Sequence, residues 1–98
     1  MDEIDSQIER LRETAYKVSR DNAGNVEREG SRFLSQVAGI SRKTFSVAED
    51  VHDALRDLLA AVRRDELDLE HRRGPVLHHL DRLEAVLRAE LATRMVTV

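Results

Sequence analysis

The apolar residues of this chain recur at alternating intervals of three and four, which is the period of α-helices with one buried face. Residues 2–21 carry one such stripe, and a second stripe, one residue out of step, follows over residues 25–39. Asparagine and glycine residues lie between the two, within residues 21–25, and these residue types are typical of turns. The pattern predicts two helices here. One continuous helix over residues 2–39 is the alternative.

A polar segment then precedes the third predicted helix. Ser46 and Glu49 have the spacing of a capping box, in which two side chains bind the free backbone amides at a helix start. The apolar stripe that follows predicts a helix over residues 46–72. Acidic residues interrupt this stripe near its end, so an earlier end near residue 66 is the alternative.

The Gly74-Pro75 pair predicts the boundary before the last helix. Glycine readily takes the left-handed conformation that follows a helix end, and proline fits the first position of the next helix, where no amide hydrogen is needed. We therefore predict a final helix over residues 75–96. Its stripe consists of Val76, Leu80, Leu83, Leu87, Leu91 and Met95.

Four stripes joined by short turns predict an all-α fold, an antiparallel up-down helical bundle of three to four helices in a single domain over residues 1–98. The register around the second turn predicts that Phe33 faces Leu55 and that Gly30 faces Leu58. A chain of this length buries only about 65% of its unfolded surface. Because this core is thin, we expect a dimer or higher oligomer with coiled-coil-like stripes.

The first stripe is the predicted interface, and it consists of Ile4, Ile8, Leu11, Ala15 and Val18. A continuous helix over residues 2–39 would be about 57 Å long, so this stripe would overhang the bundle and need a second chain. If the chain turns near residues 22–25, the stripe closes a four-helix bundle within one chain. In both cases we expect a surface that binds another copy or a partner's helix. Ile8→Asp is then expected to lower the oligomer mass and to preserve helicity.

Charge and composition narrow the classes of function. Sixteen basic and nineteen acidic residues leave a formal net charge of −3, which gives no general attraction to nucleic acid or to an anionic membrane. The chain has no cysteine, so disulfides and thiolate chemistry are excluded. No stretch approaches the roughly 18 apolar residues of a membrane span, and the acidic N-terminus is unlike a secretory signal. We therefore expect a cytoplasmic protein without a membrane span.

The histidines form no metal-binding pattern, because ligands on one helix face are spaced three or four residues apart. None of His52, His71, His78 and His79 has that spacing, and we predict no metal, cofactor or catalytic residues. The leading interpretation is a non-enzymatic helical interaction protein, such as an oligomeric adaptor, assembly factor, chaperone-like partner or regulator. The fourteen arginines leave two alternatives: a nucleic-acid-associated regulator on a dimeric scaffold, and a small all-α enzyme that binds an anionic ligand.

Overall fold

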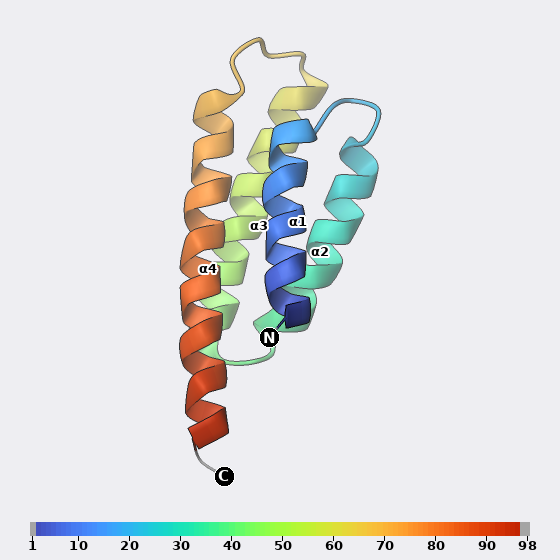
Figure 1. The fold of residues 1–98 in the computed structure, drawn as a ribbon. Coiled ribbons are helices and arrows are strands. Elements are labelled where there is room, and N and C mark those ends of the chain that lie inside the picture. The colour runs from blue at the N-terminus through green and yellow to red at the C-terminus, as the bar shows by residue number, and fades with distance from the viewer. Residues whose placement is uncertain (1, 97–98) are drawn as a thin grey trace.

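The computed structural model describes residues 2–96, and the side chains of residues 3–93. This part of the chain folds into four helices, α1 (Asp2–Lys17), α2 (Ala23–Ala38), α3 (Arg42–Arg63) and α4 (Glu70–Val96). Successive helices run in opposite directions, and the N-terminus lies at the same end of the bundle as the α2–α3 turn (Figure 1). The C-terminal turns of α4 extend past the other helices at that end. The predicted all-α helical bundle is confirmed.

One face of each helix forms the core, which runs the length of the bundle. Ile8 of α1, Leu58 of α3 and Leu80 and Leu83 of α4 are 0% exposed. Burying an aliphatic side chain of this size contributes roughly 1.5–3 kcal/mol. The predicted stripes are therefore the faces that the bundle buries, as far as residue 93; the side chain of Met95 lies outside the described residues.

The first turn is closed by the side chain of Asn22, and the alternative of a single helix over residues 2–39 is wrong. Asn22 Oδ1 accepts a hydrogen bond from the amide of Ser19 at 2.8 Å, and Asn22 Nδ2 donates to the carbonyl oxygen of Lys17 at 3.1 Å. These bonds satisfy backbone groups at the C-terminal end of α1. The helix ends at Lys17, and not at residue 21 as predicted. The chain then reverses, and α1 packs against its own bundle.

The second turn is tighter than predicted, because α3 begins at Arg42 and not at residue 46. The N-cap is Ser41, whose Oγ accepts the amide of Thr44 at 3.1 Å, so the predicted capping box lies inside the helix. Starting α3 four residues early shifts the α2–α3 register by about one helical turn. The residue that faces Gly30 is therefore Leu55, and the predicted contact with Leu58 is wrong.

The third connection lies earlier than predicted, because α3 ends at Arg63. Asp65 takes the left-handed conformation with φ of 57°, and the amide of Glu66 donates to the carbonyl oxygen of Ala61 at 3.1 Å. The amide of Asp65 also donates to the carbonyl oxygen of Val62, and the two bonds together form a Schellman cap. The alternative end near residue 66 is thus closer to the structure than residue 72.

The predicted boundary at Gly74-Pro75 is wrong, because Pro75 lies inside α4. Proline disfavours a helical residue before it through a clash with that residue's Cβ, and Gly74 has no Cβ. The missing amide hydrogen of Pro75 leaves only the His71 carbonyl without its helical donor. Burial of Val76, which is 1% exposed, stabilises the helix across this position.

Candidate docking groove between α1 and α2

The α1–α2 seam is the least packed seam between neighbouring helices. Helices α2 and α3, and likewise α3 and α4, pack along most of their length, whereas α1 approaches α2 at few positions. One position of close packing is Gly30, where an added Cβ would lie 2.7 Å from Leu55 Cδ2 of α3 and 3.8 Å from Leu11 Cδ2 of α1. Away from this point the seam opens into a groove.

Two adjoining hollows make up this feature, which we call the α1–α2 groove. The hollow nearer the N-terminus has a volume of about 230 Å³ and is lined by Glu3, Ile4, Gln7, Phe33, Gln36, Val37 and Ile40. The next hollow has a volume of about 220 Å³ and is lined by Gln7, Arg10, Leu11, Thr14, Glu29, Arg32, Phe33 and Gln36. They share Gln7, Phe33 and Gln36, so the groove is continuous.

The groove has an apolar half and a polar half. Ile4, Phe33, Val37 and Ile40 line the first hollow, whereas arginine, glutamine and threonine side chains dominate the second. On α1 the lining runs from residue 3 to residue 14 at helical spacing, which corresponds to roughly three helical turns. The groove therefore has the length of a short helical segment.

The polar half carries positive charge that the chain itself does not fully neutralise. Arg10 Nη2 lies 3.8 Å from Glu29 Oε1, and both side chains are exposed. Arg32 is exposed and forms no ion pair with any residue in the described part of the chain. Nine other arginines do pair with carboxylates, namely Arg10, Arg12, Arg20, Arg63, Arg64, Arg72, Arg73, Arg82 and Arg88.

The predicted interface residues divide between the core and the groove. Ile8, Ala15 and Val18 are buried in the core of the single chain. Ile4 and Leu11 are half-buried and line the groove. These two residues keep apolar surface that another helix can contact, and the role of the stripe between chains stays a prediction. The sequence pattern does not identify Phe33 and Arg32 as groove residues, because their place in the groove depends on how α1 packs beside α2.

A half-buried arginine holds α1 against α4, on the side of α1 away from the groove. Arg12 Nη2 donates to Asp81 Oδ1 at 2.7 Å and to Glu84 Oε1 at 3.4 Å, and its Nη1 also binds Glu9. Burial alone would lower the pKa of Arg12, but the hydrogen bonds to Asp81, Glu84 and Glu9 outweigh it and raise that pKa above its ordinary value. This cluster fixes α1 on α4, so the α2 side of α1 is left open.

A second arginine caps the C-terminal end of α1. Arg73 Nε donates to the carbonyl oxygen of Ala15 at 2.8 Å, and its guanidinium carbon lies 5.2 Å from the centre of the Tyr16 ring. The bond satisfies one of the carbonyl oxygens that a helix end leaves without a partner. Helix α4 therefore holds α1 at two places, through the carboxylates that bind Arg12 and through Arg73.

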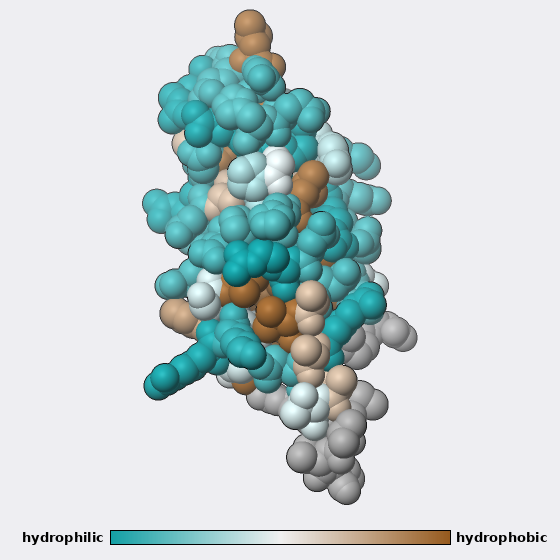
Figure 2. Space-filling model, turned by 90° about the vertical axis from the view of Figure 1, so that its left-hand side faces the viewer, coloured by the Kyte–Doolittle hydropathy of each residue, from teal (hydrophilic) through white to brown (hydrophobic). Residues whose placement is uncertain are grey.

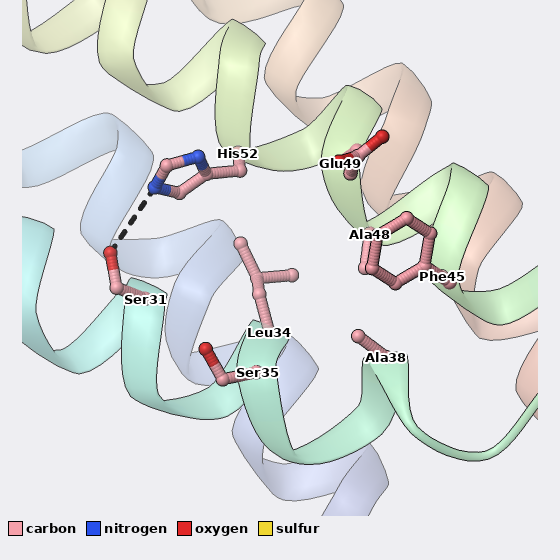
Figure 3. Close-up of a pocket in the computed structure, with 8 residues that line it drawn as sticks. All are labelled: Ser31, Leu34, Ser35, Ala38, Phe45, Ala48, Glu49 and His52. Carbon is pink, nitrogen blue, oxygen red and sulfur yellow. Dashed lines mark hydrogen bonds between the residues drawn. The ribbon is translucent and has the colours of Figure 1, made fainter.

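A smaller hollow lies on the other side of α2, against α3. Leu34 and Ala38 of α2 face Phe45 and Ala48 of α3 across about 170 Å³, with polar side chains around them (Figure 3). Ser31 Oγ and His52 Nε2 are 3.3 Å apart and bridge the two helices at one end. Phe45 is 51% exposed at its rim. The hollow is shorter than the α1–α2 groove, and no arginine or lysine lines it.

The face on the α4 side of the bundle is mostly hydrophilic. Figure 2 shows hydrophobic atoms gathered in the lower half of this face, toward the C-terminal part of α4, and at its upper tip. Leu67, in the α3–α4 connection, is fully exposed. None of the helices within residues 2–96 combines the length and the apolar character that crossing a bilayer requires. The described side chains contain no cluster of three or more potential metal ligands.

The comparisons with known proteins give no match: no protein-family model, no curated protein and no solved structure is similar to this chain.

Proposed function

We propose that this protein is a non-enzymatic helical interaction protein, an adaptor, assembly factor, chaperone-like partner or regulator that binds a helix in the α1–α2 groove. The observation that carries the proposal is the open α1–α2 seam, which contrasts with the packed α2–α3 and α3–α4 seams. Amphipathic helices bind such grooves by laying an apolar face on the floor.

The groove offers the surface that such a helix needs. Phe33 is buried beneath the groove floor and belongs to both hollows. The half-buried Ile4, Leu11 and Ile40 supply the apolar surface that a partner can contact, and polar side chains form the rim. An apolar floor with a polar rim is typical of protein–protein interfaces.

A helix of another protein is the occupant that we propose. The burial of Ile8, Ala15 and Val18 within one chain supports this occupant over a second copy, because these residues of the first stripe are then not available to another chain. Self-association through the same groove is the second form of the proposal, since Ile4 and Leu11 keep apolar surface there. We further propose that the protein acts in the cytoplasm, where proteins without disulfides are common.

Two other functions have weaker support. For a nucleic-acid regulator, most arginines would have to exchange their carboxylate partners for phosphates, because nine arginines are ion-paired. For an enzyme that binds an anion, Arg10 and Arg32 meet in one hollow. However, the carboxylate beside them, Glu29, is exposed, whereas the sites of small-molecule enzymes are typically enclosed pockets.

Leu11→Gln tests the proposal, because glutamine keeps the size and helix propensity of leucine but places an amide on the groove floor. We expect the full chain to purify from its native host with a stoichiometric partner, or to have the mass of more than one copy by light scattering. Leu11→Gln should remove that association. Leu67→Gln, at a fully exposed leucine of the α3–α4 connection, is the matched control and should retain it.

The proposal is wrong if the wild-type chain is a monomer without a stoichiometric partner. It is also wrong if Leu11→Gln, shown to be folded by circular dichroism, binds as the wild type does.

A further inference from the structure

We infer that the partner helix carries an acidic residue that pairs with Arg32, beside apolar residues that cover the floor of the α1–α2 groove. This inference rests on the proposed function and adds the chemistry of the partner. It commits to a helix of another protein as the occupant.

Charge complementarity is the first support. Arg32 is exposed, lines the polar half of the groove and has no carboxylate partner in the described residues. Arg10, across the groove, pairs with Glu29 at 3.8 Å, and it also lines a separate hollow on α1 together with Asp5, Glu9 and Glu13. Arg32 is therefore the guanidinium group in the polar half of the groove that lacks a carboxylate partner in the described residues. A carboxylate supplied by the partner would neutralise it.

The planar guanidinium groups favour a carboxylate in particular, because they donate two parallel hydrogen bonds to its two oxygens. A helix laid in the groove would exclude part of the surrounding water from Arg32, which strengthens such a pair relative to one on an open surface. The same pair outside the groove would contribute little.

The length of the groove sets the spacing on the partner. Ile4, in the apolar half, and Arg10, in the polar half, are six residues apart on α1, or about 9 Å along the helix axis. A helix that lies alongside α1 covers the same distance in about two turns. Its apolar residues should therefore occupy positions i and i+3 or i+4, and its acidic residue position i+6 or i+7.

The test uses a displayed library of amphipathic helical peptides, with apolar residues at i and i+3 and random residues at i+6 and i+7, selected against the full-length chain. We expect the selected peptides to carry Asp or Glu at one of the random positions. Arg32→Glu should weaken a selected peptide at least about tenfold, as expected for a close charge pair. Arg56→Glu, which makes the same charge change on the exposed surface of α3, should change binding less than about twofold.

Charge exchange completes the test. A selected peptide whose acidic residue is replaced by lysine should bind the wild-type chain weakly and should recover binding to Arg32→Glu. A structural effect of the substitution would not produce this recovery.

Three outcomes overturn the inference. The first is a selection that returns no binders or shows no preference for acidic residues. The second is unchanged binding to Arg32→Glu. The third is a wild-type dimer that Leu11→Gln dissociates and that excludes the peptides, because a second copy then occupies the groove. If Leu11→Gln abolishes peptide binding and Arg32→Glu does not, the proposed function stands and only the acidic partner residue is wrong.

Discussion

The α3–α4 side of the bundle and the α1–α2 seam are built from the same kinds of residue, yet only the first is closed. Leucines of α3 and α4 reach 0% exposure where these helices pack together. Across the bundle, Ile4 and Leu11 of α1 stay half-buried beside α2. An apolar stripe therefore identifies a helix face that packs, but it does not determine how completely that face is covered.

The difference arises from what holds α1 in place. Arg12 and the C-terminal end of α1 are both bound by groups of α4. Among the described residues, no hydrogen bond of comparable geometry joins α1 to α2, where the ion pair between Arg10 and Glu29 is long and exposed. Polar contacts with α4 therefore add to the burial of Ile8, Ala15 and Val18 in holding α1, whereas the seam with α2 is left as the groove.

The largest expected effect tests whether α1 belongs to the core as fully as α3 does. Leu58→Asp and Ile8→Asp each place a charge at a site that is 0% exposed, and each should cost at least about 3 kcal/mol of the free energy of unfolding. We expect both variants to lose helicity, measured by circular dichroism and urea denaturation. Arg56→Asp, at an exposed position of α3, is the control and should change stability by about 0.5 kcal/mol or less.

The sequence alone predicts a different result for Ile8→Asp, namely lower oligomer mass with helicity preserved. A folded Ile8→Asp variant with reduced mass would show that α1 serves an interface between chains and would contradict its place in the core.

The next effect concerns Gly30 of α2, which lies close to side chains of α1 and α3. Gly30→Leu adds a side chain where a single Cβ already lies 2.7 Å from Leu55 Cδ2, and such overpacking typically costs about 1–3 kcal/mol. Gly24→Leu is the matched control in the same helix, since a Cβ at Gly24 has no neighbour within 4 Å. We expect thermal denaturation to show a loss of stability for Gly30→Leu and unchanged or increased stability for Gly24→Leu. Equal effects at both glycines would rule out close packing at Gly30.

The smallest effect concerns the polar anchor of α1. Arg12→Met keeps an apolar stem but removes the bonds to Asp81 and Glu84, and the arginine side chain is only 19% exposed. We expect a loss of about 1 kcal/mol and faster hydrogen exchange of the α1 amides. Arg82→Met, which breaks a more exposed ion pair with Asp50, should leave α1 exchange unchanged. Unchanged exchange in Arg12→Met would show that apolar packing alone holds α1.

The sequence predicts an all-α bundle of three to four helices and their buried faces, because the helical period is a local property of the chain. The helix ends were predicted less well, since they depend on specific caps. Asp65 occupies a left-handed position that glycine or asparagine usually takes, and Asn22 closes a turn through bonds to α1. Neither arrangement follows from residue type alone.

The candidate groove was predicted only in part. Ile4 and Leu11 were identified from the first stripe, and they do line the groove. Phe33 and Arg32 of α2 could not be assigned to it, because the groove is formed by the packing of α1 beside α2 and against α4. The bonds of Arg12 are part of that packing, and its partners Asp81 and Glu84 are about 70 residues away in the chain.

The cap that Arg73 places on Ala15 has a consequence for the order in which the molecule is made. During translation α1 leaves the ribosome before the residues of α4 that bind it. At about 5–20 residues per second, several seconds separate the synthesis of Ala15 from that of Arg73. A nascent chain that stops before residue 73 therefore lacks the group that caps α1.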